Sequence, residues 1–144
     1  SEMKLALQLA FLLVALIPSC LCMAESMIVI RGSLTCSKPF TEHHVYLWDD
    51  DAPFKDDFLA AHDVSDSKGA AHYYEVRGTA QDFGVELYVE PFITIEHSCG
   101  GQFACVCKFF GNRHHGIHDT IDIDLEKTDL KYCDQCENAK KIRR

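Results

Sequence analysis

The amino-acid sequence predicts an all-β fold, an antiparallel β-sandwich of about seven or eight short strands with at most one short helix. The first observation is an alternation of apolar and polar residues with period two, which is typical of half-buried strands and is clearest in TIDIDLEK, residues 120–127. The second is the regular spacing of turn signals between such segments. The third is a set of six cysteines downstream of an apolar N-terminal segment, which indicates a disulfide-stapled domain.

Seven segments are expected to form strands between turns rich in Gly, Pro and Ser: residues 27–36, 43–50, 71–78, 84–91, 92–99, 104–112 and 120–127. The alternation places Cys36 on the core side of the first segment. In the second, Val45 and Leu47 are expected toward the core, whereas Tyr46 and Trp48 point to the opposite face. The best helical candidate is residues 56–62, which is too short to dominate the fold.

The N-terminus predicts a cleaved secretory signal peptide. Lys4 is followed by the apolar run LALQLAFLLVALI, which Pro18 ends. This run is shorter than the roughly 18–20 apolar residues that span a bilayer, and small residues follow it. We therefore expect a signal at residues 1–24, with the two residues before Met3 foreign to it, then one domain at 25–137 and a basic tail at 138–144. The protein is expected to be secreted, without a transmembrane span.

The six remaining cysteines are expected to form disulfides, because secreted chains are oxidised: Cys36, Cys99, Cys105, Cys107, Cys133 and Cys136. Gly100-Gly101 lies between Cys99 and Cys105, so a hairpin would bring Cys99 beside Cys105 or Cys107. Cys36 would then reach the segment of Cys133 and Cys136, and the remaining strand cysteine would take the other tail sulfur. The CxxC spacing of that segment is interpreted as structural, since no βαβ pattern precedes it.

Metal binding is not predicted, and no cofactor is expected. His97, Cys99, Cys105 and Cys107 offer zinc ligands, but their spacing lacks paired CxxC knuckles. The segment HHGIH supplies weak candidates for copper or zinc: His114, His115 and His118. Such a histidine-containing loop is more often solvated.

Six motifs occur in order along the chain: G-x-L-x-C at 32–36, VYLWDDD at 45–51, the pair Asp56-Asp57, SDSKG at 65–69, EPFITIEHSC at 90–99 and IDIDL at 121–125. Together they resemble the nematode transthyretin-like family over nearly the whole mature chain. The resemblance implies a secreted, single-domain β-sandwich of the transthyretin (prealbumin) type. Members commonly carry four cysteines, and here the third and fourth are doubled, as Cys105/Cys107 and Cys133/Cys136. The resemblance implies that the two extra cysteines form a disulfide that joins the tail to the strand.

The predicted function is that of an extracellular binding or signalling protein. A net charge of −8 argues against a nucleic-acid partner, and no catalytic constellation stands out, so an enzyme is not predicted. The family fold is similar to that of the hydroxyisourate hydrolases, but the Tyr-Arg-Gly-Ser motif of those enzymes is absent. A protein receptor or small ligand is expected to contact loops and strand faces, with Tyr46 and Trp48 as outward aromatics.

The alternative function comes from what the resemblance implies: a phosphatidylserine-binding bridge that links apoptotic cells to a phagocyte receptor. The C-terminal end carries four basic residues that would contact anionic lipid headgroups: Lys140, Lys141, Arg143 and Arg144. The overall negative charge opposes this function unless basic residues cluster on the surface.

Overall fold

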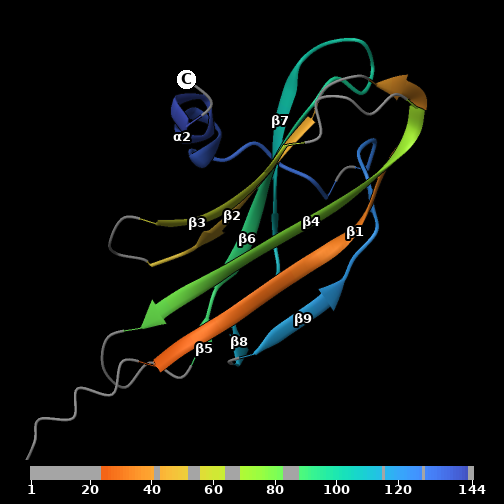
Figure 1. Ribbon diagram of the computed structural model, residues 1–144. Helices are drawn as coiled ribbons and strands as arrows, with labels where there is room; N and C mark the ends of the chain where they lie inside the picture. Colours follow the sequence, from red (N-terminus) through yellow and green to blue (C-terminus); the bar gives the residue numbers. More distant parts are fainter. Residues whose placement is uncertain are drawn as a thin grey trace, which may run out of the picture.

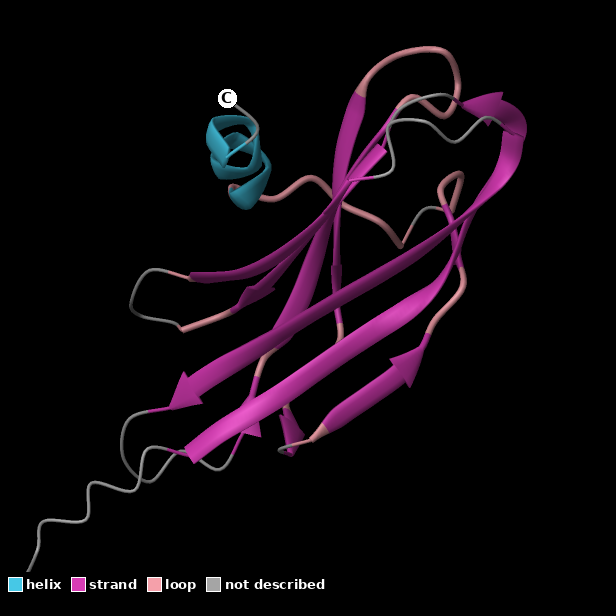
Figure 2. Ribbon diagram, viewed as in Figure 1, coloured by secondary structure: helices cyan, strands magenta, loops and turns pink. Residues whose placement is uncertain are grey.

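The computed structural model describes residues 24–40, 43–51, 56–63, 69–82, 88–114, 116–127 and 129–142. Apart from Ala24, the segment expected as a signal lies outside these residues. The described chain folds into two four-stranded sheets that pack against each other, with one short helix beside them (Figure 1). Strands make up most of the ribbon in Figure 2, which confirms the predicted all-β sandwich.

The first sheet is built on a long central strand, β1 (Ala24–Phe40). On one side β1 pairs antiparallel with β4 (Gly69–Asp82). On the other it pairs parallel with β9 (Ile117–Thr120) and then with β10 (Ile123–Asp124). The C-terminal third of the chain therefore completes the sheet that the N-terminal strand begins.

The second sheet has the order β3-β2-β6-β7, and every neighbouring pair in it is antiparallel. Its strands are β3 (Asp57–Asp63), β2 (His43–Asp49), β6 (Pro91–His97) and β7 (Ala104–Phe109). A two-stranded ribbon joins β5 (Tyr88–Val89) to β8 (Arg113–His114). Of the strand expected at 84–91, residues 84–87 lie outside the described residues.

The core lies between the two sheets and takes the apolar face of each strand. Ile28 and Ile30 of β1 are fully buried against Val45 and Leu47 of β2 in one cluster. Burying such a side chain contributes about 1.5–3 kcal/mol relative to leaving it exposed. The period-two alternation of the sequence therefore predicted correctly which side chains of β1 and β2 face the core.

Close backbone approach fixes where the C-terminal segment crosses β1. A Cβ atom on Gly32 would overlap the carbonyl oxygen of Ile121, so only glycine fits there. The Ile121 amide donates to the Arg31 carbonyl at 2.7 Å, and the Tyr74 hydroxyl donates to the Ile121 carbonyl at 2.9 Å. Burial raises the pKa of that Tyr74 hydroxyl. The Gly32 of the G-x-L-x-C motif thus serves packing between segments.

The predicted helix at residues 56–62 is wrong, because this segment is strand β3. An isolated helix of this length is marginal, whereas pairing with β2 supplies a ladder of backbone hydrogen bonds. The described helix is α2 (Gln135–Ile142), which takes in most of the segment expected as a basic tail. Glu137 in its first turn and Lys140 and Lys141 in its last turn suit the helix dipole.

Candidate functional site

A row of aromatic side chains crosses the outer face of the second sheet, with one ring on each strand. Phe58, Trp48, Phe92 and Phe109 follow one another at ring-centroid distances of 5.5, 6.3 and 4.8 Å. The strand register explains the row, since Trp48 lies opposite both Phe58 and Phe92, and Phe92 lies opposite Phe109. The two end rings are exposed, and the two middle rings are buried. A feature outside the sheet must therefore cover the middle of the row.

Helix α2 provides this cover. Its buried residues, Cys136 and Ala139, are three positions apart and so share one helix face. Ala139 packs in one cluster with Tyr46, Trp48 and Phe92, none of which is more than 3% exposed. A small alanine lets the helix approach the rings closely. The outer face of the sheet thus carries a second, smaller apolar core under the helix.

Two disulfides fix α2 and the segment just before it to the edge strand β7. Cys105 bonds to Cys136, and Cys107 bonds to Cys133. A backbone hydrogen bond of 2.7 Å from the Cys107 amide to the Lys131 carbonyl pairs the incoming segment with the edge of β7. Each disulfide closes a loop whose cross-link contributes about 2–4 kcal/mol by the chain-entropy model. The helix is therefore attached to the sheet far more firmly than its eight residues alone would allow.

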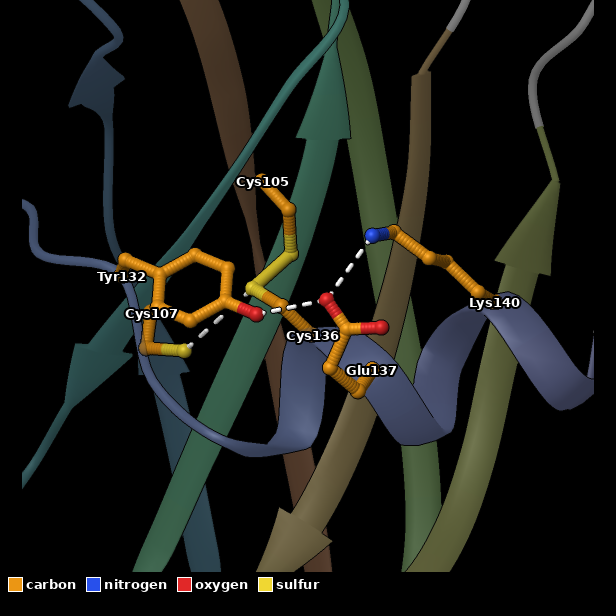
Figure 3. A network of polar contacts seen from close by, with 6 residues as sticks. All are labelled: Cys105, Cys107, Tyr132, Cys136, Glu137 and Lys140. Atoms are coloured by element: carbon orange, nitrogen blue, oxygen red, sulfur yellow. Dashed lines mark hydrogen bonds and ion pairs between the residues drawn. A yellow bond between two sulfur atoms is a disulfide. The ribbon is translucent and has the colours of Figure 1, made fainter.

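A polar network joins Tyr132, Glu137 and Lys140 on the exposed side of α2 (Figure 3). Glu137 Oε1 accepts a hydrogen bond of 2.7 Å from the Tyr132 hydroxyl and forms an ion pair of 2.8 Å with Lys140 Nζ. Hydrogen bonds from Lys140 and Tyr132 lower the pKa of the Glu137 carboxyl. The network joins the segment before the helix to its last turn, and so orders the outward surface.

A buried carboxyl group lies on the outer face of the sheet next to this network. Glu96 of β6 is fully buried and pairs across the sheet with His44 on one side and Cys105 on the other. The hydrogen bond to Glu137 raises the pKa of Lys140, and the charge of Glu96 adds to that effect. Lys140 is thus paired with Glu137 and lies within electrostatic reach of Glu96.

The expected partner residues divide into three groups in the structure. Tyr46 and Trp48 point to the outer face as predicted, but they are buried beneath α2, so the prediction that they form an exposed partner surface is wrong. Lys140 and Lys141 lie in the last turn of α2, and Lys141 is exposed. Arg143 and Arg144 lie outside the described residues.

The observed disulfides include all six cysteines, in a different pairing from the one expected. Cys36 of β1 bonds to Cys99 in the turn after β6, and both Cys105 and Cys107 bond to the tail. The expected bridge from Cys99 to the next strand is therefore wrong, as is the one from Cys36 to the tail. Stapling of the tail to β7 is confirmed, with two bonds in place of one. The Gly100-Gly101 turn leaves Cys99 on the core side, where Cys36 lies.

The histidines singled out from the sequence lie in different environments. His97 is buried, its Nδ1 accepts a hydrogen bond of 3.2 Å from the Cys99 amide, and burial lowers its pKa. His114 contacts Tyr88 in a tilted arrangement with ring centroids 4.7 Å apart, and His118 lies exposed on β9. His115 lies outside the described residues.

Potential metal ligands come together at two places in the described part of the chain. The groups are Cys107 with Cys133 and Cys136, and Cys36 with Cys99 and Glu126. All five cysteines are disulfide-bonded, and neither group contains His114, His118 or the acidic residues Asp49, Asp50 and Asp51 of the VYLWDDD motif. One of these aspartates, Asp49, accepts a hydrogen bond of 2.9 Å from the Glu90 amide.

Sequence reasoning missed α2 and the face that it covers, although a signal was present. Cys105 and Cys107 are two apart on a strand and share a face, whereas Cys133 and Cys136 are three apart, about one helical turn. A strand pair with spacing two can meet one cysteine in α2 and another two residues before the helix, Cys136 and Cys133, in two neighbouring bridges. Ala139, three residues after Cys136, extends the apolar face.

A comparison with protein families finds a match. The family model described as TTR-52: Transthyretin-like family matches residues 31–110, which is 80 of 144 residues. The match spans β1 to β7 and ends before α2 and the two tail cysteines. No curated protein matches the chain.

Proposed function

Because the chain belongs to the transthyretin-like family, we propose that it is a secreted binding protein that contacts an extracellular partner through the outward face of α2. Three disulfides favour an oxidising compartment, where such bonds form and persist. No helix in the described ranges is long and apolar enough to cross a membrane. A binding role of a general kind follows from the family, and the surface is our assignment.

The observation that carries this proposal is the double attachment of α2 to β7. A helix held by two disulfides presents its outer side chains in one arrangement, so little conformational entropy is lost when a partner binds. The surface that we call the α2 face consists of Tyr132, Glu137, Lys140, Lys141 and Ile142. Tyr132 is 59% exposed and Ile142 is 41% exposed, and tyrosine is a residue type enriched in protein interfaces. The partner that suits this face has an apolar centre and an acidic rim.

Binding of the labelled full chain to living cells tests the proposal. The wild-type protein is expected to bind saturably, and crosslinking then identifies the partner. The double variant Tyr132→Ala/Lys141→Glu should bind about tenfold more weakly, which corresponds to about 1.4 kcal/mol. The matched control is Lys38→Glu, a charge reversal at an exposed position of β1. Equal binding of the double variant and the wild type would refute the assignment of the α2 face.

Recognition of anionic lipid is the second candidate. The observation in its favour is the placement of Lys140 and Lys141 in one helical turn, next to Arg143 and Arg144 in sequence. Against it stand the net charge of −8 and the ion pair between Lys140 and Glu137. Other cations are also paired with carboxylates, including Lys108 with Asp129.

Flotation with liposomes separates the two candidates. Vesicles of phosphatidylcholine with and without phosphatidylserine are mixed with the full chain at low salt, where electrostatic attraction is strongest. Selective flotation with phosphatidylserine that is lost in Lys140→Glu/Lys141→Glu would favour the lipid bridge. Flotation that is equally absent with both vesicles is the result that the protein-partner proposal predicts.

A further inference from the structure

The two disulfides that hold α2 lie in contact with each other. Cys107 Sγ is 3.9 Å from Cys136 Sγ, although the two atoms belong to different disulfides (Figure 3). The sulfurs of Cys107, Cys133 and Cys136 all lie within 4.8 Å of one another. Cys105 Sγ is bonded to Cys136, so four sulfurs form one compact cluster. The structure thus places the sulfurs of two different disulfides side by side.

The four cysteines of the cluster differ in their exposure to solvent. Cys107 is 2% exposed and Cys136 is 0% exposed, whereas Cys105 and Cys133 are partly exposed. Each disulfide therefore joins one partly exposed sulfur to one buried sulfur. The two buried sulfurs are the pair that lies 3.9 Å apart. Cys133 and Cys105 are the more exposed cysteines of the two bonds, and the thiolate released by attack on either of them belongs to the buried pair.

We propose that these four sulfurs form a thiol–disulfide exchange site. A thiol from solution forms a mixed disulfide with Cys133, and the thiolate charge then moves from Cys107 to Cys105 by exchange at Cys136. The substrate class is a small thiol or an accessible cysteine of another protein. This chemistry goes beyond the proposed binding function and does not depend on the partner of the α2 face.

The exchange balances without any other oxidant or reductant. The external thiolate attacks Cys133 Sγ, forms a mixed disulfide there and breaks the Cys107–Cys133 bond, whose electron pair stays on Cys107 as thiolate. This thiolate attacks Cys136 Sγ, forms the Cys107–Cys136 bond and breaks the Cys105–Cys136 bond. The negative charge then rests on Cys105, which is partly exposed and takes a proton from water.

The consequence is that one thiol modifies the protein without releasing the helix. After exchange, the Cys107–Cys136 bond still joins α2 to β7, while Cys133 carries the adduct and Cys105 is a free thiol. The third disulfide, Cys36–Cys99, has no such neighbour, because its sulfurs group with Glu126 and with no third cysteine of the described chain. It serves as an internal reference for the exchange.

Two matched variants of the full chain test the exchange. Cys133→Ser leaves a thiol on buried Cys107, next to an intact disulfide, whereas Cys99→Ser leaves a thiol on buried Cys36, without a neighbouring disulfide. Each oxidised variant is incubated at neutral pH, quenched in acid, denatured and alkylated, and the label is located by peptide mass spectrometry. The expected result is label on both Cys105 and Cys107 in the first variant, and on Cys36 alone in the second.

Label confined to Cys107 in a folded Cys133→Ser variant would overturn the proposal. Fluorescence of Trp48, the only tryptophan, checks the fold of each variant. Where Cys133→Ser does not fold, Cys107→Ser takes its place and leaves Cys133 Sγ within 4.8 Å of Cys136 Sγ. In that variant label on Cys105, together with a Cys133–Cys136 bond, supports the exchange. Label that stays on Cys133 contradicts it.

Discussion

The indole Nε1 of Trp48 donates a hydrogen bond of 3.0 Å to Thr94 Oγ1, on the face of the sheet that α2 covers. Both residues are buried, so water cannot replace Thr94 as the acceptor for the indole N–H. The bond orients the ring that lies at the centre of the aromatic row. It therefore links the strand register of the sheet to the surface on which the helix packs.

Replacement of Thr94 by valine tests this bond. The change keeps the shape of the side chain and leaves a buried indole donor without its acceptor, which costs about 1–3 kcal/mol. We expect a matching loss in the free energy of unfolding, measured by urea denaturation with tryptophan fluorescence. Thr94→Ser is the control, since it keeps the hydroxyl. A stability of Thr94→Val equal to that of the wild type would show that the bond contributes nothing.

Replacement of Gly32 by alanine tests the crossing of β1 by the C-terminal segment. The added methyl group would overlap the Ile121 carbonyl, and overpacking of this kind costs about 1–3 kcal/mol. The melting temperature should fall accordingly. The exposed substitution Thr79→Ala should change stability by no more than about 0.5 kcal/mol. If Gly32→Ala melts with the wild type, the close approach is not a constraint on the fold.

The sandwich itself was predictable from the sequence because each strand has to bury one face. Val45 and Leu47 face the core, and Tyr46 and Trp48 face the other way, as the alternation predicts. A period of two tells the two faces apart but does not say whether the second face meets water. Here it meets Ala139, from a segment 91 residues after Trp48. No periodic pattern in the sequence predicts a contact between segments so far apart.

The disulfides were predictable as a set and not as pairs. Cys99 and Cys105 are close in sequence, and this proximity suggested a bridge across the Gly100-Gly101 turn. The orientation of the side chains decides otherwise. Cys99 is packed against the core with Cys36, and Cys105 pairs across the sheet with Glu96, whose side chain lies on the outer face. Only the three-dimensional faces of the strands separate these alternatives.

Protonation of His97 predicts how stability depends on pH. Burial lowers the pKa of His97 in the folded chain, so below about pH 6.5 the unfolded chain binds more protons than the folded one. Stability from this group is present above pH 6.5 and is lost as pH falls from there toward the lower folded pKa. Denaturation at a series of pH values should show a smaller decline in His97→Asn, which keeps an acceptor for the Cys99 amide.

Exposed His118 supplies the control for this experiment. His118→Asn removes an imidazole from β9 without touching the buried site. It should reproduce the wild-type dependence of stability on pH. An identical decline of stability at low pH in the wild type and in His97→Asn would show that His97 does not cause it.

The central claim is that two disulfides hold α2 over the aromatic face of the second sheet, and quenching of Trp48 fluorescence by acrylamide tests it most directly. The single tryptophan is 3% exposed under the helix. Cys133→Ser/Cys136→Ser releases both attachments, whereas Cys36→Ser/Cys99→Ser removes the disulfide between β1 and the turn after β6. We predict weak quenching in the wild type and in folded Cys36→Ser/Cys99→Ser, and strong quenching in Cys133→Ser/Cys136→Ser. Equally weak quenching in all three proteins would contradict the claim.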